Sequence, residues 1–191
     1  MLIALSTRRK DEPRDLVDLL AECHARIRRF LELAHEAAIR IDAPADQVSQ
    51  ACADVERYFI EALPLHVADE EESIAPRLKA LSSEVDRALD MMTQQHEQHS
   101  PTLVELLRAS ATVRAQPNHQ GARDHLAKVA QALKVEFEEH LTLEETVIFP
   151  AIRGLLLPEI QALIVSELRN RRQAGGPEKK SSTNPSQKDQ S

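Results

Sequence analysis

Residues 66–76 read His-Val-Ala-Asp-Glu-Glu-Glu-Ser-Ile-Ala-Pro, and residues 140–150 read His-Leu-Thr-Leu-Glu-Glu-Thr-Val-Ile-Phe-Pro. The two stretches share His, two consecutive Glu, Ile and Pro at a constant offset of 74 positions. In each stretch a glutamate follows the histidine by four residues, a spacing that stacks side chains roughly 5–6 Å apart on an α-helix. The pairs are His66 with Glu70 and His140 with Glu144. Each pair offers an imidazole and a carboxylate to one point, and together they predict a two-metal centre.

A lone histidine precedes each pair by a similar distance. His24 lies 42 residues before His66, and His96 lies 44 residues before His140. The difference requires only two extra residues in a loop of the second half. The chain therefore reads as a duplicated pair of helices, with one lone histidine and one His/Glu pair in each copy.

The composition favours an all-α fold. The chain has 191 residues, of which 42% are hydrophobic and 29% charged, as in an ordinary soluble domain with a substantial core. Only four glycines and 3% aromatics are present, whereas good helix formers dominate. We expect an N-terminal extension at residues 1–13, one helical domain at 14–169 and a disordered basic tail at 170–191.

Charge and cysteine usage limit the partners and the setting. The net charge is −7, and five Lys or Arg against two acidic residues make the tail basic, so the body is strongly acidic. An acidic body argues against nucleic acid as the main partner. No stretch approaches the length of a membrane span, and the N-terminus lacks a signal-peptide pattern. With only Cys23 and Cys52, both expected to be buried thiols, we expect a reducing cytoplasm.

Apolar residues recur at spacings of three and four along four segments, which predicts four amphipathic helices joined by short turns. Such connections favour an antiparallel up-down-up-down bundle. Ligands on antiparallel helices share one height only if the chain reverses midway between them. The midpoints between successive site histidines are residues 45, 81 and 118, and all three fall in predicted turns. We also expect Pro64 to kink the second helix, and a short last helix from Pro158 to about Leu168.

Buried histidines and glutamates at one level would be costly without compensation, because each loses hydration. A metal pair supplies that compensation, and imidazole with carboxylate suits iron, manganese or zinc. The alternative is that each pair is a solvated i,i+4 hydrogen bond, which two repeated pairs on core-facing seams disfavour. A ferritin-like site needs two Glu-x-x-His motifs, and Glu32 with His35 is the only match. His35, His119 and His125 are expected to be ordinary residues away from the site.

These motifs resemble the hemerythrin-like, or HHE cation-binding, family over about residues 14–153. The resemblance implies a four-helix bundle holding two iron ions (Fe²⁺/Fe³⁺) bridged by two glutamates and an oxo or hydroxo group. Other transition metals stay open. Members of the family bind oxygen or sense oxygen, iron or nitric oxide. Carried over by motif, the terminal ligands are His24, His66, His96 and His140, and the bridging ligands are Glu70 and Glu144.

The third helix departs from the family pattern. Oxygen-carrying hemerythrins place two histidines four apart there, but this chain has Ser100 four residues after His96. His99 faces inward. It is either a fifth nitrogen ligand or a hydrogen-bond donor to a residue that binds the metal. Without a fifth histidine, a further coordination position stays open, which favours reactivity over simple oxygen carriage. Glu71 and Glu145 repeat as well, but they point about 100° away from the ligand face, so we expect surface or supporting roles rather than ligation.

Three functions follow from this reading. The first is a cytoplasmic di-iron protein that binds or senses oxygen or a related small molecule, a diatomic or peroxide, in an apolar pocket lined by residues such as Phe59, Leu63 and Phe137. The second is a di-iron redox enzyme acting on peroxide or nitric oxide. The third is an iron-buffering protein in which the metal stabilises the fold. The sequence does not decide whether the protein is an enzyme, and it names no protein partner.

Overall fold

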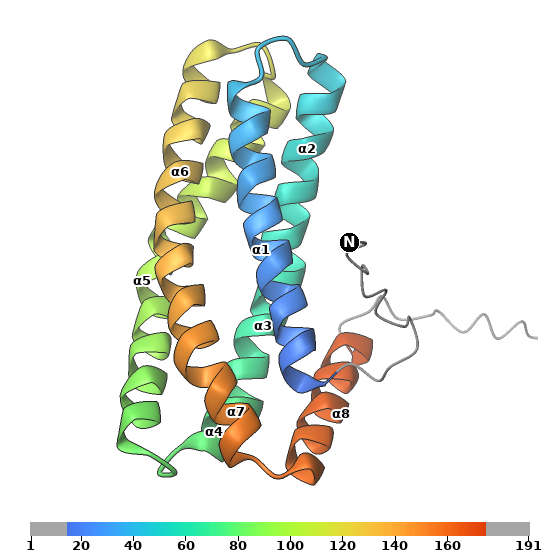
Figure 1. Ribbon diagram of the computed structural model, residues 1–191. Coiled ribbons are helices and arrows are strands. Elements are labelled where there is room, and N and C mark those ends of the chain that lie inside the picture. Colours follow the sequence, from blue (N-terminus) through green and yellow to red (C-terminus); the bar gives the residue numbers. More distant parts are fainter. Residues whose placement is uncertain (1–14, 175–191) are drawn as a thin grey trace, which may run out of the picture.

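The computed structural model describes residues 15–174, and every regular element in that part of the chain is a helix (Figure 1). The predicted all-α class is thus confirmed. The first rod is a single helix and the second is a series of short segments: α1 (Leu16–Ile39), α2 (Ala45–Arg57), η1 (Tyr58–Ala62), α3 (Leu63–Ala68), η2 (Asp69–Ile74) and α4 (Ala75–Leu78). The remaining elements are α5 (Ser83–Ala115), α6 (Gln120–Leu143), η3 (Glu144–Ile148), α7 (Phe149–Leu155) and α8 (Pro158–Ala174).

The four rods of the bundle run in alternating directions along the chain (Figure 1). α1 packs against α2 and α6, and α5 packs against the same two helices on the other side. The chain reverses at residues 40–44, 79–82 and 116–119. The last two turns contain the midpoints expected from the histidine spacing, and the first turn ends one residue before residue 45. The site histidines on the four rods therefore lie at one height along the bundle, as their spacing predicts.

Local side-chain chemistry sets where the long helices begin. The Oδ1 of Asp15 accepts a 2.7 Å hydrogen bond from the amide of Asp18 at the start of α1. Ser82 caps α5, and the Nδ1 of His119 accepts a 3.0 Å hydrogen bond from the amide of Ala122 at the start of α6. Each cap satisfies an amide that has no partner within its own helix. His119 is thus a capping residue.

Three prolines each follow a π-helical turn. Pro64 follows η1, Pro76 follows η2 and Pro150 follows η3, each at the start of the next α-helical segment. Proline cannot donate the i→i−4 hydrogen bond and clashes with the preceding turn, and the wider π turn relieves both problems. The kink expected at Pro64 is therefore the π-helical turn η1 that precedes it. Because Pro76 and Pro150 belong to the repeat, both glutamates of the repeat begin or nearly begin a π turn.

The core consists of two apolar clusters on either side of the predicted site. The cluster towards the α1–α2 and α5–α6 turns includes Ile27, Leu63, Phe137 and Leu141. The other cluster, towards the α4–α5 turn and α8, includes Leu20, Met92 and Ile148. The buried histidines and glutamates of the predicted site lie between the two clusters. Dry packing above and below excludes water from this layer.

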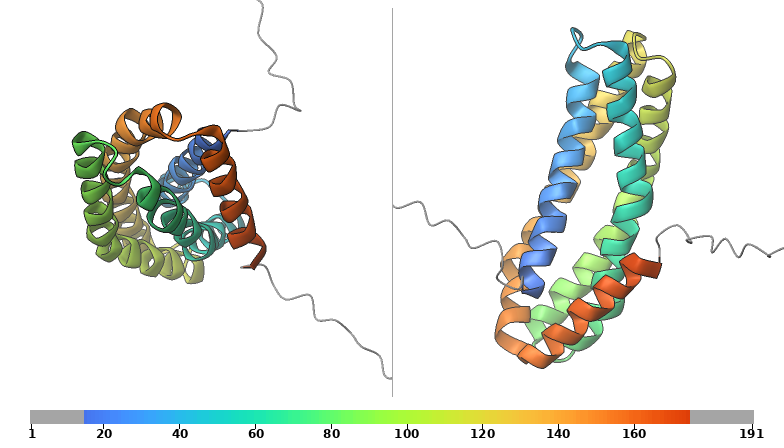
Figure 2. Two further views of the ribbon diagram at one scale, coloured as in Figure 1. Left: turned by 90° about the horizontal axis from the view of Figure 1, so that it is seen from below. Right: turned by 90° about the vertical axis from the view of Figure 1, so that its right-hand side faces the viewer.

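α8 differs from the expected short helix. It packs obliquely against one end of the bundle and continues to Ala174, six residues beyond Leu168 (Figure 2). The prediction of disorder from residue 170 is therefore wrong for residues 170–174. These residues are helical, and Arg171 and Arg172 among them reach the buried Asp69. Residues 175–191 and the expected extension at 1–13 lie outside the described residues. None of the helices within 15–174 has the length and apolar character needed to cross a bilayer.

Candidate metal centre

The structure brings the six predicted ligands together in two groups of donor atoms. The first group is His24, His66, Glu70 and Glu144, and the second is Glu70, His96, His140 and Glu144. Within each group the donor atoms all lie within 4.8 Å of one another. Both groups contain both glutamates. The arrangement therefore has an approximate two-fold symmetry that matches the sequence repeat.

Each glutamate turns one oxygen towards each group. Glu70 places Oε1 3.0 Å from Nε2 of His66 and Oε2 3.4 Å from Nε2 of His96. Glu144 places Oε2 2.9 Å from Nε2 of His24 and Oε1 3.1 Å from Nε2 of His140. A carboxylate with one oxygen directed to each of two sites is placed to bridge two cations.

The donor atoms are deeply buried and lack ordinary partners. Glu70 and Glu144 are 3% and 1% exposed, and His24 is fully buried. Among the residues that the structure describes, both oxygens of each glutamate and the Nε2 atoms of His24 and His66 lack a well-formed hydrogen bond. Unpaired buried polar atoms are rare because each one costs free energy. Cations coordinated by these atoms would remove that cost, so the residues fit a metal pair.

Burial keeps two of the ligand histidines neutral. It lowers the pKa of His66 to about 3 and that of His140 to about 4, against the opposing attraction of Glu144. Histidine coordinates metal only in its neutral form. Both side chains thus hold their lone pairs ready at neutral pH.

The two glutamates titrate as a pair. Burial, followed by the neighbouring charge of Glu144, raises the pKa of Glu70 well above its usual value. Burial alone would raise the pKa of Glu144 too, but the close approach of His24 and the electrostatic attraction of the surrounding histidines lower it to about 2. Two carboxylates this close favour either a shared proton or a cation between them.

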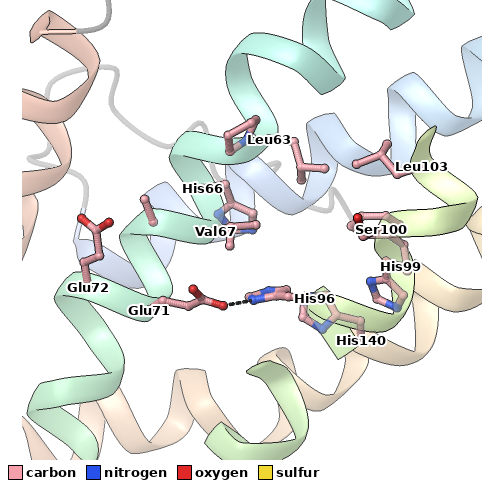
Figure 3. Close-up of a pocket in the computed structure, with 13 residues that line it drawn as sticks. Leu63, His66, Val67, Glu71, Glu72, His96, His99, Ser100, Leu103 and His140 are labelled. Carbon is pink, nitrogen blue, oxygen red and sulfur yellow. Dashed lines mark hydrogen bonds and ion pairs between the residues drawn. The ribbon is translucent and has the colours of Figure 1, made fainter. Parts of the chain in front are cut away.

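Outer carboxylates orient two of the histidines. His24 donates from Nδ1 to Oε1 of Glu145 at 2.8 Å, and His96 donates from Nδ1 to Oε1 of Glu71 at 2.8 Å (Figure 3). These bonds place the proton on Nδ1 and leave Nε2 free for a metal. Glu71 and Glu145 occupy equivalent positions in the repeat, and each supports a histidine of the other half. The supporting role expected for them is thus what the geometry supplies.

The two outer carboxylates differ in their own partners. Arg28 donates to Glu145 from Nη1 at 2.7 Å and also pairs with Glu138 through Nε at 2.9 Å. Glu71 is 39% exposed and has no cationic partner beyond His96 among residues 15–174. His140 donates instead to the amide oxygen of Gln95 at 3.1 Å. Sequence reasoning missed Arg28 and Gln95, because both depend on contacts between helices that no spacing reveals.

A pocket of about 300 Å³ opens beside both donor groups. His66, His96 and His140 reach its floor, and its walls include the apolar Leu63, Val67, Leu103 and Phe137 (Figure 3). Leu63 and Phe137 lie where we expected them. Phe59 does not line this pocket, because it is packed inside the apolar cluster next to Leu63.

His99 and Ser100 line this pocket as well, on the α5 side. The His99 ring lies 5.2 Å from that of His140 and 4.8 Å from that of Phe137, measured between centroids. His99 belongs to neither donor group, so the structure places it beside the second group rather than within it. Its Nδ1 is buried without a partner among the described residues. Burial lowers its pKa, assisted by repulsion from His96.

The other candidate residues lie apart from the centre. His125 pairs with Glu105 on the surface at 2.7 Å, and His35 belongs to neither donor group. Cys52 is fully buried, as expected, but Cys23 is only partly buried, because the neighbouring position of His24 takes the inward face of α1. Burial raises the pKa of the Cys23 thiol. This raised pKa favours the unreactive thiol form over a redox-active thiolate.

The fold and the donor set are those of a metal-binding helical bundle. A sequence profile of the hemerythrin HHE cation binding domain matches residues 15–118, which is more than half of the chain. The chain therefore belongs to the hemerythrin HHE cation-binding domain family. The matched region contains His24, His66, Glu70 and His96, whereas His140 and Glu144 join the site through the repeat and the geometry.

Curated relatives occur in mycobacteria. The chain is 33% identical over 143 residues to uncharacterized protein Rv1995 of Mycobacterium tuberculosis, and it matches uncharacterized protein Mb2018 of Mycobacterium bovis to the same extent. Each alignment covers 73% of this chain and 53% of the relative. The chain thus spans about half the length of the curated relatives it matches.

Proposed function

We propose that this chain is a non-haem di-iron protein that binds or senses oxygen or a related small molecule, either a diatomic gas or peroxide. One observation carries the proposal: two donor groups share both glutamates, and three of their four histidines line one pocket. Family membership and the His/Glu cluster indicate metal binding. The choice of iron and of a small ligand is our inference from the chemistry of the site.

The donor set suits iron. Neutral imidazoles and carboxylates bind iron, manganese and zinc well, and the centre contains no cysteine sulfur. Glu70 and Glu144 would bridge the two ions, His24 and His66 would hold one, and His96 and His140 would hold the other. Bound iron would supply a redox-active centre with open coordination positions, because the family's further histidine on the third helix is replaced by Ser100.

The protein's own residues control access to the second group. Leu63, Leu103 and Phe137 give the pocket apolar walls beside the histidines at its floor, which favours the entry of small uncharged molecules. A volume of about 300 Å³ is several times the roughly 30 Å³ that one water molecule occupies in the liquid. The pocket therefore admits a diatomic molecule or peroxide with room to spare.

A second candidate is a redox enzyme that acts on peroxide or nitric oxide. His99 favours it, because its buried Nδ1 has no protein partner and its ring forms part of the pocket wall. A nitrogen in this position can hydrogen-bond a small ligand and orient it towards the second group. Simple gas binding in a purely apolar pocket would not need this side chain.

The test begins with the iron-loaded protein kept free of oxygen. Its visible spectrum is recorded before and after oxygen is added, after oxygen is removed, and then with peroxide. Bands that appear and disappear with oxygen support binding, whereas continuous consumption of peroxide or nitric oxide supports the enzyme. His99→Leu, with His35→Leu as the matched control, should lower turnover or oxygen affinity without loss of iron. A spectrum that responds to none of these molecules would refute both candidates and leave iron buffering.

The setting and the partners are part of the proposal. Two free thiols are consistent with a reducing cytoplasm, and the acidic body is consistent with a protein that does not bind nucleic acid. A sensor would transmit its signal through a protein partner or through released iron.

A further inference from the structure

The two halves of the repeat differ on one face of the glutamate-bearing turn. The first half has Asp69, Glu72 and Ser73, whereas the equivalent residues of the second half are Leu143, Thr146 and Val147. Leu143 and Val147 pack against the apolar cluster near α8. Positions separated by three and four residues lie on the same side of a helix. The first half thus has a polar face beside Glu70 where the second half has an apolar one.

α8 covers this polar face. Arg171 contacts all three of its residues: it pairs with Asp69, with Glu72 through Nη2 at 3.0 Å and with Ser73 through Nη2 at 3.2 Å. Arg172 donates from Nη2 to Oδ2 of Asp69 at 2.6 Å. The second half has no such clamp on Leu143. The two halves of the repeat therefore differ at the residues that α8 contacts.

Asp69 makes this contact specific. It is fully buried, so its carboxylate is stable only with charged partners, and both partners come from the last turn of α8. Asp69 opens the π-helical turn η2 and immediately precedes Glu70. A π turn is less regular than an α-helical turn, so its exact path depends on tertiary contacts. Contacts that hold Asp69 thus also hold the backbone that presents Glu70.

α8 reaches the other side of the same donor group as well. The Nη2 of Arg172 lies 3.9 Å from Sγ of Cys23, which precedes His24 on α1. The last turn of α8 therefore touches the residues next to two ligands of the first group. In the second group, His96 is contacted by Glu71 and His140 by Gln95, and neither of these residues belongs to α8.

We propose that Asp69 is a positioning residue which, clamped by Arg171 and Arg172, fixes the bridging Glu70, and that the clamp acts more strongly on the first metal position because Arg172 also contacts Cys23 beside His24. This inference rests on the proposed dinuclear centre. Because Glu70 belongs to both donor groups, the clamp reaches both metal positions, but the contact with Cys23 adds an effect on the position held by His24 and His66. The C-terminal helix thereby makes the two metal positions unequal.

The test uses the full chain with Arg171→Ala and Arg172→Ala combined, and with Asp69→Asn alone. Arg169→Ala, an exposed arginine on the same helix, is the matched control. Ferrous iron is titrated without oxygen against a competing chelator, and the electron paramagnetic resonance signal of the one-electron-oxidised pair is recorded. We expect one of the two irons to bind on the order of tenfold more weakly. The signal of the coupled pair should weaken in favour of that of a single iron, and the control should match the wild type.

Other results would overturn the proposal. If the double variant melts at a lower temperature but binds both irons with wild-type affinity and signal, the clamp only stabilises the fold. Equal weakening of both irons would also contradict it, because the effect would then not be specific to the first position. If Asp69→Asn does not fold, the arginine variants still decide, since their side chains are partly exposed. A wild-type protein that holds fewer than two irons would instead refute the proposed function.

Discussion

Replacing Glu71 or Glu145 with alanine should weaken iron binding at a different position in each case. Glu145 accepts the Nδ1 proton of His24 in the first donor group, and Glu71 accepts that of His96 in the second. Such acceptors orient the imidazole and make its other nitrogen a better ligand. We expect Glu145→Ala to weaken the first position and Glu71→Ala to weaken the second.

The size of the effect follows from the contacts. A hydrogen bond to a charged group contributes about 1.5–3 kcal/mol, and about 1.4 kcal/mol corresponds to a tenfold change in affinity. Glu71 and Glu145 are 39% and 35% exposed, so solvent screens both and the lower end applies. We expect a loss of about tenfold for Glu71→Ala. Glu145→Ala should lose more, because Arg28 would remain near His24 with only Glu138 to offset its charge.

The assay is anaerobic titration with ferrous iron against a chelator, which resolves two binding constants. Glu138→Ala is the matched control, because it removes the other partner of Arg28 but contacts no ligand histidine. This control should bind iron like the wild type. If Glu71→Ala and Glu145→Ala also bind both irons like the wild type, the proposed support of the histidines is refuted.

Three further perturbations test the site and its frame. His140→Ala and Glu144→Ala should each abolish the two-iron centre whereas His35→Ala should not, and a full iron content in either of the first two would refute the ligand assignment. Burial lowers the pKa of His66 to about 3 and that of His140 to about 4, from 6.5. At these two histidines the unfolded chain therefore binds more protons below pH 6.5, so each costs the metal-free protein up to about 1.4 kcal/mol of stability per pH unit on acidification, and the raised pKa of Glu70 offsets part of this loss. Denaturant unfolding at pH 7 and pH 5 measures this loss, which equal free energies would contradict. Arg123→Ala should lower the free energy of unfolding by about 3 kcal/mol, because its buried guanidinium donates to the carbonyls of residues 37, 38 and 40 at the end of α1; unchanged stability in the same assay would show that these bonds contribute nothing.

Spacing alone predicted the height of the site, because helices have a fixed rise per residue. Four histidines equidistant from short turns must meet when those turns reverse the chain, and His24, His66, His96 and His140 do so. The same argument placed Glu70 and Glu144 on the faces of their helices that point towards the site. Repetition was the decisive signal, since one His/Glu pair occurs easily on a solvated helix.

Contacts between helices were beyond such reasoning. Nothing in the spacing links Arg171 to Asp69 across a hundred residues, so the end of α8 was predicted too early and the basic residues were assigned to the tail. The sequence also predicted a kink at Pro64 but not its form. A π turn adds a residue to the helical turn, and whether proline produces one depends on how the neighbouring rods pack.

The central claim is tested most directly by counting iron in the wild-type protein after loading and removal of excess metal, with Glu70→Ala and Glu144→Ala measured in parallel. Two donor groups that share both glutamates predict two irons per chain, magnetically coupled, and loss of the coupled pair in both variants. One iron or fewer per chain in the wild type, or two irons that are not coupled, would contradict a dinuclear centre bridged by Glu70 and Glu144.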